Sequence, residues 1–334
     1  MKIGSKELNM ITLGVLKIKE ENGWFSFHRF GEKLETYHSS RGENVKNRAL
    51  STALVKLEFY TKGGNISFEY EISPGVLREY YSIDLTVDGV YQYNIAKDLN
   101  RDSDSFNFNI DKSEKEKRIT IYFPTTTRIK LKNHNIPDDF LPHRRSRNVL
   151  LMGASYYQGY HPNHFQNTCM NVLSDALDVN MINQAIGGDC FNKDNIEKIN
   201  IDVDFIMVSY GTNDWACGRF KNGEDASEYI ERLVELYPEK RIFLILPPDI
   251  NYLMKTKKND DLLFEKSEGG YQTLEDVRNI LISIAKNYVN IVTLNAKNYI
   301  QQYPESFYSD NVHLTDLGNI IFANNMLKDI KMYV

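Results

Sequence analysis

The stretch NVLLMGAS, residues 148–155, combines four apolar residues with a glycine, an alanine and a serine. A short apolar run that ends at a glycine is typical of a buried strand that turns toward a helix. In open parallel sheets, functional groups collect in the loops beyond the carboxyl ends of the strands. Ser155 is therefore the first candidate nucleophile. The stretch is not the Gly-x-Ser-x-Gly elbow of α/β-hydrolases, because Tyr157 occupies the position of the second glycine.

The chain after residue 147 alternates short apolar runs with helical stretches. This alternation predicts βα units around a parallel sheet of about five strands, with helices as the outer layers of a three-layer α/β domain. We expect strands at 148–152, 179–183, 205–209, 241–246 and 290–294, and helices near 163–177, 224–236 and 273–287. The last helix is expected to be amphipathic. Its apolar stripe would comprise Leu317, Ile320, Ile321, Leu327 and Ile330. The charged segment 249–271 ends in two glycines and is interpreted as an inserted loop or lid.

The first half of the chain has a β-rich rhythm instead. Short runs broken by Gly, Asn, Asp and Ser predict an antiparallel sandwich without long helices. Residues 55–59 and 66–70 alternate apolar and polar side chains around a turn at 62–65, which predicts a hairpin with one buried face. Further strands are expected at 82–87, 90–94, 106–110, 118–123 and 128–132. Pro137 and Pro142 mark the boundary between a domain at 1–140 and a second domain at 147–334.

Two further strand ends and the segment just before the last helix carry candidate functional residues. Gly188 follows the second strand; a tight turn would explain it, but a glycine there also lets a backbone N–H approach an oxyanion. Asn213 follows the third strand within Gly-Thr-Asn-Asp, where it either belongs to a helix cap or donates its side-chain amide. Asp310 stands three residues before His313, a spacing that lets the carboxylate fold back on the ring and fix its tautomer.

Together these four stretches resemble the sequence blocks of the SGNH (GDSL-like) hydrolase family. Ala154 stands where the family has the Asp of Gly-Asp-Ser, which is not a triad member. The resemblance implies a serine esterase in which Ser155 is the nucleophile and Asp310 and His313 activate it. It also implies an oxyanion hole made by Ser155, Gly188 and Asn213, with no metal and no cofactor. Two aromatic residues beside these stretches are expected to line the substrate pocket, namely Tyr157 and Trp215.

The first half is similar to the jelly-roll domain that precedes the SGNH domain in several carbohydrate esterases. The similarity rests on YSIDLTVDG at 81–89 and ITIYFP at 119–124. It implies an acylated oligosaccharide as substrate, with acetyl as the expected acyl group. Two alternatives stay open: a lysophospholipase or thioesterase, and an inactive carbohydrate-binding protein. An apolar tunnel would favour the lipid substrate.

Composition narrows the class further. The net charge is −5, and the single basic cluster at 143–147 predicts no nucleic-acid partner. No apolar stretch approaches the ~20 residues that a membrane-spanning helix needs, so no membrane partner is expected. Three cysteines without a CxxC pair argue against a disulfide scaffold or a zinc site. The first residues have no apolar core of a signal peptide, so a cytoplasmic location is expected. The oligomeric state does not follow from these features.

Overall fold

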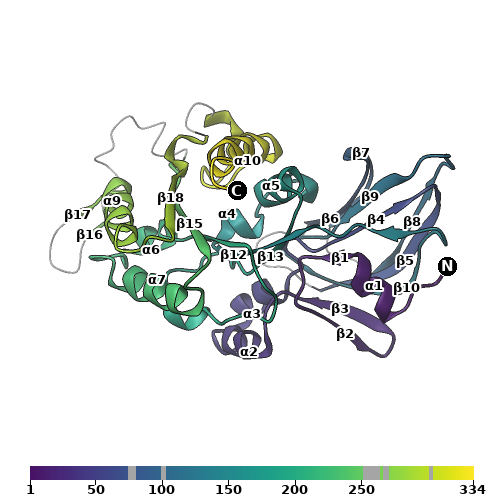
Figure 1. Cartoon of the computed structure of the whole chain (residues 1–334), viewed down its shortest axis with the longest axis horizontal. Helices are drawn as coiled ribbons and strands as arrows, with labels where there is room; N and C mark the ends of the chain where they lie inside the picture. The colour runs from purple at the N-terminus through teal and green to yellow at the C-terminus, as the bar shows by residue number, and fades with distance from the viewer. Residues whose placement is uncertain (74–79, 99–102, 251–263, 266–270, 301–303) are drawn as a thin grey trace. The chain divides into compact units, whose positions relative to one another are not determined.

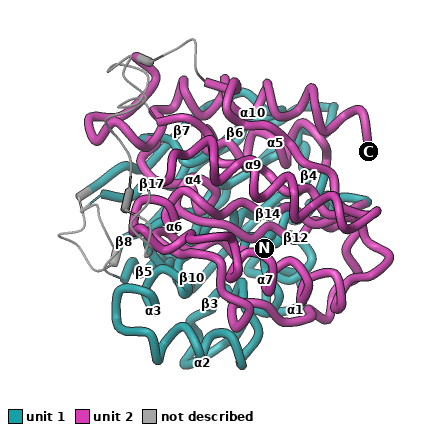
Figure 2. Tube along the Cα trace, turned by 90° about the vertical axis from the view of Figure 1, so that its left-hand side faces the viewer, with its two compact units in different colours: residues 1–146, 163–166, 179–183 teal, residues 147–162, 167–178, 184–334 magenta. Residues whose placement is uncertain are grey.

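The computed structural model describes residues 1–73, 80–98, 103–250, 264–265, 271–300 and 304–334. The chain forms two compact units, coloured separately in Figure 2. The first contains residues 1–146 and two short later segments, 163–166 and 179–183. The second contains residues 147–162, 167–178 and 184–334.

The first unit is an antiparallel β-sandwich, as expected. One sheet has the order β2-β3-β10-β5-β8, and the other has the order β1-β4-β9-β6-β7, with β11 added beside β4. The strands of the first sheet are β2 (Lys17–Glu21), β3 (Trp24–His28), β10 (Arg128–Asn135), β5 (Gly64–Ser73) and β8 (Ser103–Ile110). Those of the second are β1 (Thr12–Leu13), β4 (Lys56–Thr61), β9 (Lys117–Tyr122), β6 (Tyr80–Val87), β7 (Val90–Asp98) and β11 (Leu141–Pro142).

The core of the sandwich follows from alternation along the strands. On β5, every second side chain from Ile66 to Ile72 is buried, because successive side chains of a strand point to opposite faces. Phe68 stacks on Phe106 of the neighbouring strand β8, with ring centroids 4.6 Å apart. Ile121 of the other sheet belongs to the same buried cluster. The two inner faces therefore share one hydrophobic core.

The predicted hairpin at 55–70 is wrong. Its two strands exist as β4 and β5, but β4 pairs with β9 in one sheet and β5 pairs with β8 and β10 in the other. The connection therefore carries the chain from one sheet to the other. Gly63 makes this crossing possible with φ +129°, since a Cβ there would lie 2.7 Å from the carbonyl oxygen of Asp111. Alternation alone could not distinguish the two arrangements, because it does not say which strand each one pairs with.

The first unit also contains three helices where none was expected. They are α1 (Ser5–Ile11), α2 (Glu32–Ser40) and α3 (Glu43–Leu50). Each is at most nine residues long and begins after a glycine. Helix α3 buries only Ala49, and α2 buries only Leu34 and His38. Such short helices with so few buried residues leave no clear apolar period in the sequence.

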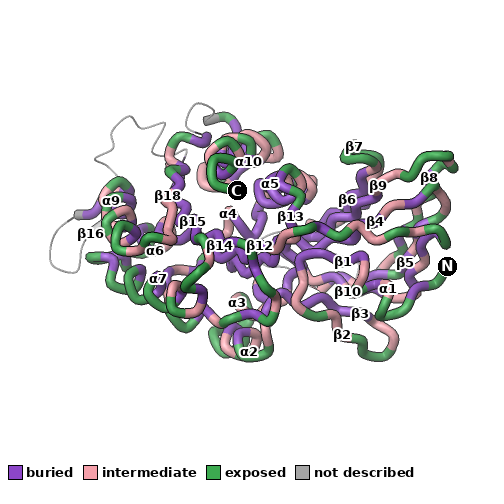
Figure 3. Tube along the Cα trace, in the orientation of Figure 1, coloured by how far each residue is buried: buried purple, intermediate pink, exposed green. Residues whose placement is uncertain are grey.

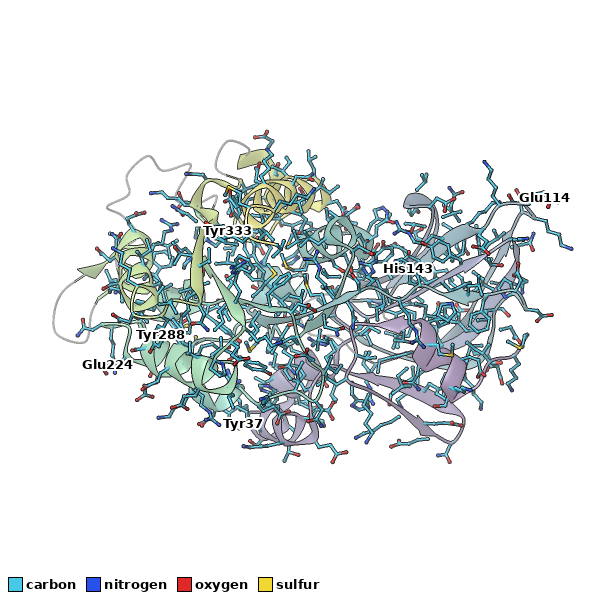
Figure 4. All side chains as sticks on the ribbon, in the orientation of Figure 1. Tyr37, Glu114, His143, Glu224, Tyr288 and Tyr333 are labelled. Carbon is cyan, nitrogen blue, oxygen red and sulfur yellow. The ribbon has the colours of Figure 1, made fainter. Side chains whose placement is uncertain are left out.

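The chain after residue 146 forms the expected five-stranded parallel sheet, in the order β13-β12-β14-β15-β18, and all of its strands except β13 belong to the second unit. Its strands are β13 (Val179–Asn183), β12 (Arg147–Gly153), β14 (Phe205–Ser209), β15 (Arg241–Leu246) and β18 (Ile291–Asn295). The central strands are buried along most of their length (Figure 3). Figure 1 shows α5 (Cys169–Leu177) and α10 (Asp316–Ile330) on one face of this sheet, and α7 (Glu224–Leu236) and α9 (Leu274–Ala285) on the other. Glu224, which begins α7, is exposed at the outer side of the unit (Figure 4).

Helix α10 buries only part of the predicted stripe. Ile330 is buried as expected, but Leu317 is 59% exposed, and Phe322 and Met326 are buried instead. The buried stripe includes Asn319, whose side chain accepts a hydrogen bond from the N–H of Cys169 on α5. Because this polar residue lies on the packed face, the apolar residues alone did not indicate which face of the helix is buried.

The second half of the chain also tests the predictions of a helix at 163–177, of a loop at 249–271 and of unpaired cysteines. The helix expected at 163–177 is divided into η1 (Phe165–Asn167) and α5, which Thr168 caps. The loop expected at 249–271 lies mostly outside the described residues. All three cysteines are free thiols. Among the helices of the described residues, none is long and apolar enough to cross a bilayer.

A buried ion pair in the sandwich allows a test of the first unit. Glu58 accepts two hydrogen bonds from Arg145, at 2.9 and 2.7 Å, and both side chains are at most 1% exposed. Removing one charge leaves the other buried without its counter-ion. We expect Glu58→Gln to lower the free energy of unfolding by roughly 3–5 kcal/mol in urea denaturation. The control Glu43→Gln breaks the exposed pair with Lys46 and should change it by less than about 1 kcal/mol. Similar losses of stability in both variants would contradict the view that the buried pair of Glu58 and Arg145 stabilises the first unit.

Candidate active site

The candidate nucleophile lies where β12 turns into the short helix α4 (Ser155–Gln158). Strand β12 ends at Gly153, where a Cβ would lie 2.8 Å from the carbonyl oxygen of Ser209 on β14. The glycine therefore lets the two parallel strands approach closely at their carboxyl ends. Ser155 is the first residue of α4, and no acceptor within the described residues bonds its backbone N–H. That N–H is one of the donors that a helix N-terminus leaves unsatisfied.

Ser155, His313 and Asp310 lie in one hydrogen-bonded row. Oγ of Ser155 is 2.7 Å from Nε2 of His313, and Nδ1 of the same ring is 2.6 Å from Oδ2 of Asp310. A carboxylate can only accept hydrogen bonds, so Nδ1 carries the proton and Nε2 is left to accept from the serine hydroxyl. The three side chains thus have the geometry of a Ser–His–Asp triad.

Asp310 is held in its ionised form. Partial burial would raise its pKa, but hydrogen bonds from the His313 ring and from the backbone N–H groups of Val312 and His313 outweigh this effect. These two N–H groups donate to Oδ1 at 2.8 and 2.9 Å. The pKa of Asp310 is therefore well below its ordinary value. The carboxylate stays charged at neutral pH and can stabilise a protonated His313.

The loop after β13 contains the predicted oxyanion donor Gly188. The N–H of Gly187 donates to Oε1 of Gln158 at 2.6 Å, so this neighbour is already occupied. The N–H of Gly188, by contrast, has no acceptor within the described part of the chain. Gly188 has φ +80°, which favours glycine at this position. Within the described residues, the hydrogen bonds therefore leave the N–H of Gly188 available to a ligand.

Asn213 is fixed on the short helix α6 (Thr212–Ala216). One of its amide N–H bonds donates to the carbonyl oxygen of Asp189 at 2.9 Å, which leaves the second N–H for a ligand. The helix starts at Gly211, whose N–H donates to Asp214. Burial raises the pKa of Asp214 to about 6, although hydrogen bonds from the N–H groups of Phe191 and Gly211 oppose the shift. Asp214 is thus a buried cap that holds the segment carrying Asn213.

A cavity of about 70 Å³ opens beside Ser155. Tyr157 contributes to its wall, although its ring is 2% exposed and packs near Phe322. Trp215 is in a different place. Its side chain is 2% exposed, and its indole N–H donates to the carbonyl oxygen of Gln272 at 3.1 Å. Among the described residues, the structure brings Tyr157 but not Trp215 to the lining of this cavity.

Two residues at the site were not singled out from the sequence. The hydroxyl of Tyr156 donates to the carbonyl oxygen of Val312, which ties α4 to the segment that carries His313. Nε2 of His161 lies 3.1 Å from Oδ2 of Asp310. Ligand atoms of His161, Asp310 and His313 lie within 4.8 Å of one another, so this cluster could in principle hold a metal ion. No sequence pattern links His161 to the Asp-x-x-His segment.

Comparisons with known proteins identify the fold. No family model matches the sequence, and no curated protein does so either. Among solved structures, a salicylyl-acyltransferase from a tetracycline biosynthetic pathway is 15% identical, with a TM-score of 0.76 over 96% of this chain and 95% of that one. A GDSL-like lipase from Bacteroides ovatus is 14% identical, with a TM-score of 0.72 over 99% and 97%. A family two carbohydrate esterase from Clostridium thermocellum, solved with cellohexaose, is 10% identical, with a TM-score of 0.63 over 84% and 93%. The chain therefore has the SGNH hydrolase fold, preceded by an antiparallel sandwich, which confirms the resemblance at the level of the fold.

The placement of Asn213 leads to a kinetic prediction. We expect Asn213→Ala to lower kcat by roughly 10²–10³-fold, the usual cost of removing one oxyanion donor, with a smaller effect on KM. Steady-state hydrolysis of a nitrophenyl ester measures both constants. A change confined to KM would make Asn213 a substrate-binding residue instead.

Asp310 and His313 should differ in their effects on catalysis. Asp310 acts through the ring of His313, whereas His313 itself contacts the serine hydroxyl. We therefore expect Asp310→Asn to lower kcat less than His313→Ala, in parallel assays at one pH. Equal losses would show that the ring cannot work without the carboxylate.

Proposed function

We propose that this protein is a serine esterase that removes short acyl groups through an acyl-serine intermediate. The observation that carries the proposal is the row of hydrogen bonds from Ser155 through His313 to Asp310, at 2.7 and 2.6 Å. A serine hydroxyl is a weak nucleophile unless an adjacent base accepts its proton. His313 is in position to do so, and the SGNH fold, which includes lipases and esterases among its members, supports the same reaction class.

Each step of the reaction uses groups already described. Oγ of Ser155 attacks the ester carbonyl carbon while Nε2 of His313 takes its proton, and Asp310 stabilises the resulting imidazolium. The backbone N–H groups of Ser155 and Gly188 and the amide of Asn213 bind the oxyanion. The intermediate collapses when the C–O bond breaks and His313 protonates the departing alcohol. Water then attacks the acyl-serine with His313 again as base, which releases the acid and restores the serine.

The size of the cavity favours a short acyl group. Pockets for drug-sized ligands have volumes of roughly 300–1,000 Å³. The cavity of about 70 Å³ beside Ser155 is several times smaller. As bounded by the described residues, it is large enough for an acetyl group and too small for an extended acyl chain, which argues against the lysophospholipase alternative. Its walls include Tyr210, Pro248 and Val312.

The choice of a carbohydrate ester rests on the structural neighbours. Several of them are named as family two carbohydrate esterases, including one from Cellvibrio japonicus, and one was solved with cellohexaose. The expected antiparallel sandwich before the SGNH domain is the second support. The proposed substrate is therefore an acylated oligosaccharide. The proposed reaction needs no metal and no cofactor. The acyltransferase neighbour defines the main competing outcome, transfer of the acyl group to a hydroxyl other than water.

A series of nitrophenyl esters of increasing chain length tests the acyl preference. We expect the acetyl ester to have the highest kcat/KM and the efficiency to fall beyond butyryl, because each further methylene has no apolar space to fill. A tunnel would instead gain about 0.8 kcal/mol of binding per buried methylene. The Ser155→Ala variant is the matched control and should show no hydrolysis above background.

A maximum at octanoyl or longer would contradict the short-acyl proposal while leaving the serine mechanism in place. Acetylated xylo-oligosaccharides then test whether the alcohol part of the ester is a carbohydrate, with released acetate as the readout. Acyl transfer to an added alcohol that outpaces acetate release would favour the transferase outcome.

A further inference from the structure

A second imidazole approaches the carboxylate of Asp310 from a different part of the chain. His161 lies six residues after Ser155, in the loop that follows α4. Its Nε2 is 3.1 Å from Oδ2 of Asp310, the same oxygen that faces Nδ1 of His313. The centroids of the two imidazole rings are 4.8 Å apart. Both histidine side chains are about 15% exposed.

The carboxylate of Asp310 can accept a further hydrogen bond in this position. The side chain of Asp310 is 35% exposed, so water competes for its lone pairs. Backbone N–H groups of Val312 and His313 hold Oδ1. Oδ2 has two lone pairs, and His313 uses one of them. A donor at 3.1 Å is within hydrogen-bonding distance and fits the second lone pair.

The backbone at His161 is shaped for this contact. Its φ is +74°, an uncommon value for a non-glycine residue, and the next residue is Pro162. The ring stacks on Tyr308, with centroids 4.8 Å apart and planes 22° apart. Tyr308 in turn donates its backbone N–H to the carbonyl oxygen of His313 at 2.7 Å. An uncommon backbone conformation beside a reactive cluster points to a functional constraint.

We propose that His161 is a positioning residue, whose Nε2–H donates to Oδ2 of Asp310 and keeps the carboxylate aligned with His313. This inference rests on the proposed function, because Asp310 matters only if His313 is the base. This role involves no proton transfer, because the contact between His161 and Asp310 is a hydrogen bond. The contact also joins the loop after α4, the helix that begins at Ser155, to the segment that carries Asp310 and His313. The triad thus becomes a row of four side chains.

Two substitutions separate hydrogen bonding from packing. His161→Phe keeps an aromatic ring against Tyr308 but removes the donor, whereas His161→Gln keeps an amide N–H but removes the ring. Both variants place a non-glycine residue at the same positive φ. The difference between their rates therefore does not depend on the energetic cost of that backbone conformation. The readouts are kcat and KM for a short acyl ester, and the second-order rate at which a fluorophosphonate labels Ser155. The labelling rate reports activation of the serine for any substrate class.

We expect His161→Phe to lower kcat and the labelling rate about tenfold at unchanged KM, and His161→Gln to stay within about threefold of wild type. In the Asp310→Ala background, His161→Phe should have no further effect, because its target is gone. EDTA should change neither rate in the wild-type protein. Thermal midpoints confirm that each variant is folded.

Three results would overturn the proposal: wild-type rates in His161→Phe, a further tenfold loss in the Asp310→Ala background, or loss of activity with EDTA that Zn²⁺ restores. The last would make the cluster a metal site. A wild-type protein that is labelled at Ser155 but hydrolyses no short acyl ester would overturn the proposed function and leave the role of His161 standing.

Discussion

The hydrogen bond between Oγ of Ser155 and Nε2 of His313 joins residues that are 158 positions apart in the sequence. It can form only because the sheet is parallel, so that β12 and the segment before α10 deliver their residues to the same edge. The close approach of β12 and β14 at Gly153 sets where α4 begins. The position of the serine and of its N–H, for which the described residues offer no acceptor, depends on that turn.

The site is also supported by groups that need not touch a substrate. Asp214 is buried and accepts the N–H of Gly211, which fixes the start of α6 and so the amide of Asn213. Gln158 occupies the N–H of Gly187 and leaves the next N–H available. Tyr156 connects α4 to the carbonyl oxygen of Val312. A donor that is already oriented needs no reorganisation when the oxyanion forms, which is why such supports matter for rate.

The parallel sheet could be predicted nearly to the residue, because β13, β14 and β15 are short apolar runs with polar boundaries. The candidate triad could be predicted because Ser155 follows β12 and because Asp310 stands three residues before His313, just ahead of the last helix. The crossing at Gly63 could not, since alternation along β4 and β5 does not say which strand each one pairs with. Nor could the position of Trp215 or the contact of His161 with Asp310, because both depend on how distant loops pack.

The most direct test of the account is to trap the acyl-serine intermediate. The protein is mixed with a slowly hydrolysed nitrophenyl ester, quenched in acid, digested and analysed by mass spectrometry. The account predicts one acyl group on the peptide that contains Ser155, and no adduct in the Ser155→Ala variant. An acyl group on another residue, or turnover of the ester with no adduct at Ser155, would contradict it.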